Sequence, residues 1–72
     1  MEEILKNNRW FHYRTGCACV GLPRYWRNEE RPGWTVVIRG NMYSINENNC
    51  QVARGTEIDF ETKMRKLNLI PS

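Results

Sequence analysis

Four side chains that commonly bind zinc occur in this sequence, at positions His12, Cys17, Cys19 and Cys50. Three cysteines and one histidine are one of the usual ligand sets of a structural zinc ion. The spacing argues against this site, because a C-x-C pair is tighter than the usual C-x-x-C pair of zinc ligands. Free cysteine is also a common small core residue. We therefore predict reduced cysteines and no cofactor, with a structural zinc at His12, Cys17 and Cys19 as the alternative.

The same residues could support two other chemistries. His12 and a cysteine could act as base and nucleophile, but no pattern indicates an oxyanion hole or an orienting third group. A chain of 72 residues has little room for a concave substrate pocket. A disulfide between Cys17 and Cys19 is disfavoured, because alternate residues of an extended strand lie near the upper Cα–Cα limit for a bridge. We predict that the protein is not an enzyme and has no small-molecule substrate.

Cations and aromatic residues are mixed at positions 24–27, which read R-Y-W-R. This combination is typical of surfaces that bind single-stranded nucleic acid, where cations contact phosphates and rings stack on bases. Residues 9–39 have a net charge of +4, whereas residues 1–8 sum to −1 and residues 40–72 to zero. Arginine also outnumbers lysine eight to three, and the planar guanidinium suits phosphate recognition. The predicted contact residues are Arg14, Arg24, Tyr25, Trp26, Arg27 and Arg39.

Two other interpretations of positions 24–27 stay open. Tyr25 or Trp26 could fold back over a small core while the arginines stay in solvent. Aromatic residues with arginine are also typical of protein interfaces. The leading hypothesis is a small non-enzymatic binding module that contacts nucleic acid through its first half. The alternative is a protein-interaction or self-associating module, such as a homodimer.

The length and composition predict one small domain over residues 1–72. Such a domain buries only roughly 60% of the surface that its unfolded chain exposes. A composition of 40% apolar and 26% charged residues is that of a globular protein. Residues 1–8 do not resemble a signal peptide, no apolar run approaches the length of a membrane span, and three cysteines argue against a secreted disulfide framework. We predict a cytoplasmic protein without a membrane partner.

The strongest signal for local structure is a hairpin at residues 34–45. Apolar residues alternate along 34–39, and Gly40-Asn41 fits a two-residue type II′ turn. This turn pairs Arg39 with Met42, Ile38 with Tyr43 and Val36 with Ile45. The register places one apolar set on a single face of the sheet, namely Trp34, Val36, Ile38, Tyr43 and Ile45.

The segments before this hairpin give weaker signals. Residues 2–7 predict a short helix. Residues 9–22 predict two short strands around Thr15-Gly16, and residues 23–33 a long surface connection with room for one helical turn at 24–29. In the first pair, the apolar face would hold Phe11, Tyr13, Ala18, Val20 and Leu22. The opposite face would hold Trp10, His12, Arg14, Cys17 and Cys19.

The segments after the hairpin predict one more strand and a helix. Residues 50–53 would return as a third strand that pairs Ile45 with Cys50 and Tyr43 with Val52. A helix would begin at Thr56 or Asp59 and present a stripe of Phe60, Met64 and Leu67 to the sheet. The predicted fold is therefore α+β, a small antiparallel β-meander of four to five short strands with a C-terminal helix packed on one face.

Overall fold

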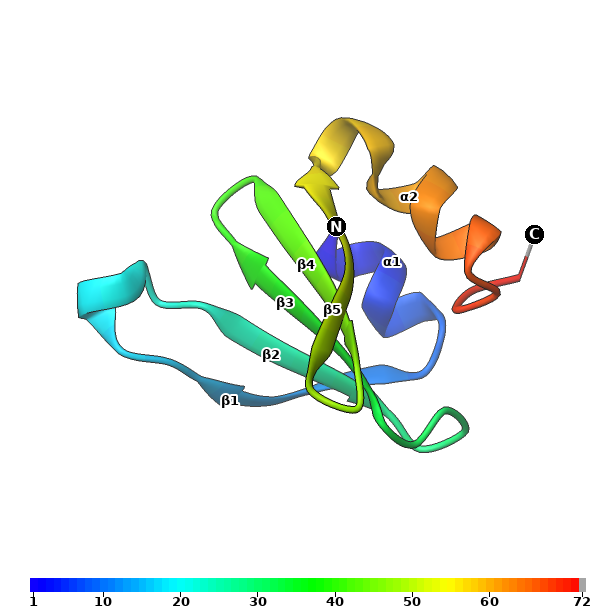
Figure 1. The fold of residues 1–72 in the computed structure, drawn as a ribbon, viewed down its shortest axis with the longest axis horizontal. Coiled ribbons are helices and arrows are strands. Elements are labelled where there is room, and N and C mark those ends of the chain that lie inside the picture. The colour runs from blue at the N-terminus through cyan, green and yellow to red at the C-terminus, as the bar shows by residue number, and fades with distance from the viewer. Residues whose placement is uncertain (72) are drawn as a thin grey trace.

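Five antiparallel strands and two helices make up the fold of the computed structural model, which describes residues 1–71 (Figure 1). Each strand pairs with its neighbour along the chain, so the sheet is a meander of order β1-β2-β3-β4-β5. The elements are α1 (Glu2–Asn7), β1 (Trp10–Thr15), β2 (Arg24–Asn28), β3 (Trp34–Arg39), β4 (Met42–Glu47), β5 (Cys50–Thr56) and α2 (Glu57–Lys66). The predicted meander with a C-terminal helix is confirmed. Within residues 1–71, no helix has the length and hydropathy needed to cross a bilayer.

The β3–β4 hairpin has the predicted turn and register. Arg39 lies opposite Met42, Ile38 opposite Tyr43, and Val36 opposite Ile45. Gly40 has a φ of +60°, in the left-handed region where glycine carries no steric penalty. The turn and the alternation of apolar residues require the same register, which explains why this prediction is correct in detail.

The β4–β5 pair differs from the predicted register. Ile45 lies opposite Ala53 rather than Cys50, because the turn has only two residues and pairs Glu47 with Cys50, and because β5 contains one extra residue, Val52, that forms a bulge. Asn48 and Asn49 make the turn with φ values of 51° and 69°, a conformation that asparagine tolerates better than most residues. The predicted pairs Ile45–Cys50 and Tyr43–Val52 are therefore wrong, and Cys50 is exposed opposite Glu47.

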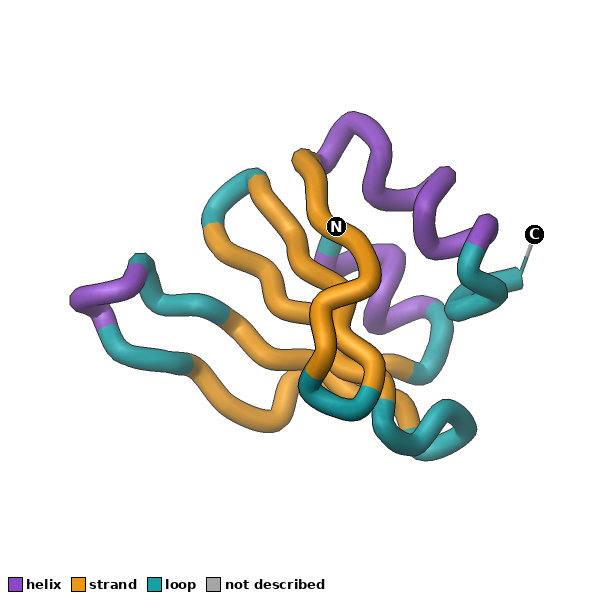
Figure 2. The backbone as a smooth tube through the Cα atoms, viewed as in Figure 1, coloured by secondary structure: helices purple, strands orange, loops and turns teal. Residues whose placement is uncertain are grey.

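The partner of β1 also differs from the prediction. β1 pairs with residues 24–28, which form β2 instead of a surface connection with a helical turn. Residues 17–22 form no strand. They lie in a loop that contains the 3-10 turn η1 (Ala18–Val20), and Gly16 N–H closes this loop by donating to Pro23 O at 2.7 Å. Figure 2 shows that the loop extends away from the helices.

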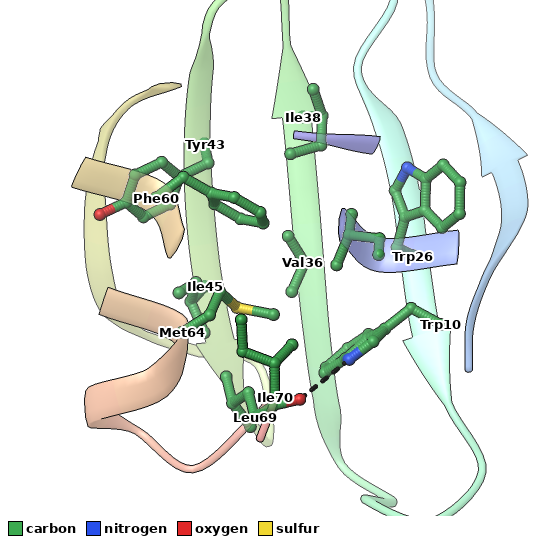
Figure 3. Close-up of a cluster of buried hydrophobic side chains, with 11 residues drawn as sticks. Trp10, Trp26, Val36, Ile38, Tyr43, Ile45, Phe60, Met64, Leu69 and Ile70 are labelled. Carbon is green, nitrogen blue, oxygen red and sulfur yellow. Dashed lines mark hydrogen bonds between the residues drawn. The ribbon is translucent and has the colours of Figure 1, made fainter. Parts of the chain in front are cut away.

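One face of the sheet packs against α1, α2 and the C-terminal segment, as Figure 3 shows. Trp10 is in this core rather than on the opposite face, and its Nε1–H donates to Leu69 O at 3.1 Å. Buried tryptophan usually needs such a partner for its indole N–H. The core consists of Leu5, Trp10, Trp26, Val36, Ile38, Tyr43, Ile45, Phe60, Met64, Leu69 and Ile70.

A carboxylate fixes the start of α2 to the sheet. Asp59 accepts hydrogen bonds from the Thr56 backbone N–H at 3.1 Å and from the Tyr43 hydroxyl at 3.0 Å. Gly55 allows this close approach, because a Cβ there would lie 2.7 Å from the Asp59 carboxylate. Burial, together with the Asp59 carboxylate, raises the pKa of Tyr43 to about 12. The helix therefore begins after Thr56, the first of the two predicted positions.

Candidate nucleic-acid interface

One face of the sheet packs against the helices. We call the other face, which includes residues of all five strands, the open face. In an antiparallel pair, residues directly opposite each other point to the same side, so the observed register defines this set. The open face consists of Phe11, Tyr13, Arg14, Tyr25, Arg27, Thr35, Val37, Arg39, Met42, Ser44, Asn46, Gln51, Arg54 and Thr56. This set contains four arginines and no aspartate or glutamate.

A bulge in β1 brings two consecutive residues to the open face. His12 lies opposite Trp26 and Arg14 lies opposite Tyr25, so Tyr13 is the extra residue. A bulge of this kind redirects side chains and ends the strict alternation of a strand. Tyr13 and Arg14 can therefore both contact side chains of β2 on the same side of the sheet.

Arginines and tyrosines stack on each other across β1 and β2. Arg14 Cζ lies 4.1 Å from the centre of the Tyr25 ring, and Arg27 Cζ lies 4.3 Å from the centre of the Tyr13 ring. The two tyrosine rings contact each other edge to face, with centroids 6.1 Å apart. Such cation–π contacts hold the guanidinium groups in place while their N–H edges stay exposed. The four side chains thus form an ordered group of donors and ring surfaces.

Ion pairing separates the arginines of the open face from those elsewhere in the chain. Three of the eight arginines form ion pairs, namely Arg9 with Glu30, Arg24 with Glu2, and Arg65 with Glu61. Arg31 donates to the backbone oxygen of Asn68. The remaining arginines are Arg14, Arg27, Arg39 and Arg54. Within residues 1–71 none of these four has an ion-pair partner, and all four lie on the open face.

A shallow hollow of about 240 Å³ lies on the β3–β5 part of the open face. Arg39 and Arg54 both line it, so two of the four arginines face one depression. Its other lining residues are Val37, Met42, Tyr43, Ser44 and Gln51. The depression therefore combines two cations with hydroxyl, amide and apolar groups.

The structure brings together four of the six predicted contact residues and separates the other two. Arg14, Tyr25 and Arg27 belong to the stacked group, and Arg39 lies on the same face. Trp26 is only 1% exposed and packs in the core. Its indole N–H and the Arg24 guanidinium both donate to the Glu2 carboxylate on the helix side of the sheet. Trp26 and Arg24 therefore lie on the face of the sheet opposite Tyr25 and Arg27, because side chains alternate along β2.

Three cationic or aromatic members of the open face are not among the predicted contacts, namely Phe11, Tyr13 and Arg54. Tyr13 and the 43% exposed Phe11 were assigned to a core face together with apolar residues of 17–22, but residues 17–22 form no strand, and Trp10 and His12 are the residues of β1 on the helix side. Arg54 lies in the half of the sequence that has no net charge, and the incorrect β4–β5 register left it outside the sheet. Its pairing opposite Ser44 places it on the open face. The correct pairing of the strand after the hairpin would have placed Arg54 on the open face.

The possible zinc ligands do not come together. The His12 ring lies on the helix side of the sheet, 5.7 Å from the Trp26 ring, and its Nε2 contacts Thr15 Oγ1 at 2.9 Å. Cys17 and Cys19 lie in the loop between β1 and β2, so the predicted shared face with His12 is wrong. Across residues 1–71, no three His, Cys, Asp or Glu side chains form a group that could hold a metal ion.

Comparisons with protein-family models, curated proteins and solved structures found no match to this chain. A function for the open face must therefore be inferred from its own geometry and charge.

Proposed function

We propose that this chain is a cytoplasmic, non-enzymatic module that binds single-stranded nucleic acid across the open face. One observation carries the proposal: the four arginines without ion-pair partners in residues 1–71 share a sheet face that lacks carboxylates. Clustered guanidinium groups attract an anionic polymer and form paired hydrogen bonds with phosphate oxygens. The exposed cysteines Cys17, Cys19 and Cys50 are all free, which fits a reducing compartment.

The dimensions of the open face suit a short segment of nucleic acid. Arg14 and Arg54 lie in one row of opposed residues that crosses all five strands. With strands about 4.8 Å apart, the two ends of this row are separated by about 19 Å. This width favours a site of a few nucleotides, at the lower end of the range for small single-strand-binding domains.

The aromatic residues favour a single strand over a duplex. Phe11 is 43% exposed, and the rings of Tyr13 and Tyr25 lie beside the arginines. Bases that are not paired can stack on such rings, whereas the bases of a duplex are already stacked on each other. Stacking on aromatic residues has little dependence on base identity. We therefore expect low sequence specificity.

A fluorescence-anisotropy titration with labelled single-stranded oligonucleotides at several salt concentrations tests the proposal. Four phosphate contacts predict a slope of about −3 for the logarithm of the binding constant against the logarithm of the salt concentration. The double variant Arg14→Gln with Arg27→Gln removes two of these phosphate contacts and should make the slope less steep by about 1.4. The affinity at low salt should fall as well. A duplex of the same length should bind more weakly than the single strand.

A matched control removes the same charge from the other side of the sheet. Lys6 in α1 and Lys66 in α2 are exposed, so Lys6→Gln with Lys66→Gln lowers the net charge by the same amount. This control should leave the salt slope close to that of the unaltered protein. The proposal is rejected if no oligonucleotide binds at low salt, or if both double variants weaken binding equally.

Self-association is the second candidate, because β1 and β5 are both edges of the sheet. Unpaired backbone groups on an edge strand can pair with another chain. Both edge strands, however, contain a bulge, at Tyr13 in β1 and at Val52 in β5, and bulges discourage edge pairing. Sedimentation equilibrium showing a monomer over a wide concentration range would eliminate this candidate.

A further inference from the structure

Two cysteines lie side by side in the loop between β1 and β2. Cys17 Sγ and Cys19 Sγ are 2.6 Å apart, and the backbone N–H of Cys19 donates to Cys17 Sγ at 3.3 Å. This geometry is not that of the extended strand expected from the sequence. Cys17 directly precedes the 3-10 turn at 18–20, which curls the chain back and brings the two side chains to the same side.

We propose that Cys17 and Cys19 are a redox-active dithiol, which low-molecular-weight disulfides oxidise to an intramolecular disulfide by thiol–disulfide exchange. Both cysteines are exposed, so a small disulfide can reach them. The contacts of the two sulfurs are with each other and with the Cys19 backbone rather than with an arginine of the open face. The inference therefore does not depend on nucleic-acid binding.

The exchange occurs in two steps that each conserve electrons. The thiolate of Cys17 attacks one sulfur of the small disulfide, a Cys17–sulfur bond forms, and the first small thiolate leaves with the electron pair of the broken bond. Cys19 then loses its proton to solvent and attacks Cys17 Sγ, and the second small thiolate leaves. The two protein thiols are oxidised, and the small disulfide is reduced to two thiols.

The contacts assign different roles to the two sulfurs. The side chain and the backbone N–H of Cys19 hydrogen-bond to Cys17 Sγ and lower the pKa of the Cys17 thiol. The same side-chain contact raises the pKa of Cys19. Because the thiolate is the nucleophile, Cys17 is the attacking residue and Cys19 resolves the mixed disulfide. Cys50 lies at the start of β5, in a different part of the molecule, and cannot take the resolving role.

The surroundings of the loop allow this change without disturbing the core. Every residue from Cys17 to Leu22 is exposed, so none of these side chains supports the packing of the sheet. Gly21 and Leu22 take up the bend with φ values of 89° and 51°. A disulfide in a reducing compartment is usually transient, which fits a bond in an exposed loop better than a structural bond.

Intact-mass spectrometry after treatment with oxidised glutathione tests the proposal. The parent protein carries Cys50→Ser, so that only the loop cysteines react. We expect a product lighter by two hydrogen atoms, with no glutathione retained, and its conversion back to the starting mass by dithiothreitol. A parent protein that keeps two glutathione groups, or that does not react, would overturn the proposal.

Two further variants in the Cys50→Ser background test the roles of the sulfurs. Cys19→Ser retains the attacking thiol and should accumulate one stable glutathione adduct, because no resolving thiol is left. Cys17→Ser should form its adduct more slowly, because the remaining thiol of Cys19 does not receive the two hydrogen bonds that favour the thiolate at Cys17. Equal or faster reaction of Cys17→Ser would overturn the assignment of Cys17 as the attacking thiol.

Discussion

Tyr25 and Trp26 are neighbours in the sequence but lie on opposite faces of the sheet. Tyr25 stacks under Arg14 on the open face, whereas Trp26 is buried and donates its indole N–H to Glu2. Composition alone indicates that positions 24–27 could bind nucleic acid, but it does not show which residues share a face. Once these residues are known to form a strand, the alternation of side chains places Tyr25 and Arg27 on one face and Arg24 and Trp26 on the other. The predicted contact residues therefore divide between the two faces according to this alternation.

The Tyr43 hydroxyl gives a prediction about stability at high pH. Its pKa is raised to about 12 in the folded protein, above the ordinary value of about 10 that applies to the unfolded chain. The folded state thus holds its proton more tightly between these pH values. The stabilisation is complete below about pH 10 and is lost as the pH rises towards 12. We expect the free energy of unfolding to fall by about 2 to 3 kcal/mol over this window.

Tyr43→Phe is the variant that checks this prediction. It removes both the titrating group and its hydrogen bond to Asp59, so it should cost about 1 kcal/mol at neutral pH. Its stability should then decline less than that of the unaltered protein between pH 10 and pH 12 in urea denaturation experiments. An equal decline in both proteins would show that other groups cause the loss at high pH.

At the scale of the elements, the β3–β4 hairpin could be predicted in detail and the two edge strands could not. In the hairpin, the Gly40 turn and the alternation of apolar residues specify one register. Each edge strand instead contains an extra residue, Tyr13 or Val52, and one extra residue moves the following side chains to the other face. A bulge has no simple sequence pattern, residues 17–22 form a loop instead of the expected strand, and the turn at 48–49 is shorter than expected, so the partner and faces of β1 and the register of β5 were wrong.

The conformation of Gly40 predicts a cost for replacing it. A Cβ at this position would contact no atom within 4 Å, so steric collision does not oppose a side chain. Gly40→Ala must nevertheless place an L-residue at a φ of +60°, which costs about 1 to 2 kcal/mol. We expect the free energy of unfolding to fall by this amount in chemical denaturation.

The neighbouring position provides a control for this substitution. Asn41 is in the same exposed turn but does not have a positive φ, so Asn41→Ala should change stability by well under 1 kcal/mol. Similar losses in the two variants would mean that the conformation of Gly40 is not the reason for the cost.

At the scale of the whole molecule, the two sides of the sheet differ in their roles. The helices, the apolar core and the Glu2 ion pair lie on one side, and the four arginines without ion-pair partners in residues 1–71 lie on the other. Three of these four arginines lie in the positively charged segment 9–39 and are among the predicted contacts. Arg54 comes from a segment without net charge, and only the folded sheet places it on the same face as the others. Local charge therefore identifies three of the four arginines of the open face, and strand pairing adds the fourth.

The most direct test of the open face as a binding surface is a titration followed by NMR. A ¹H–¹⁵N spectrum that includes the arginine Nε–H signals is recorded as a single-stranded oligonucleotide is added at low salt. We predict that the largest shifts come from Arg14, Tyr25, Arg27, Arg39 and Arg54, with little change in α1 and α2. A spectrum that does not change, or shifts that are largest in the helices, would contradict the proposed interface.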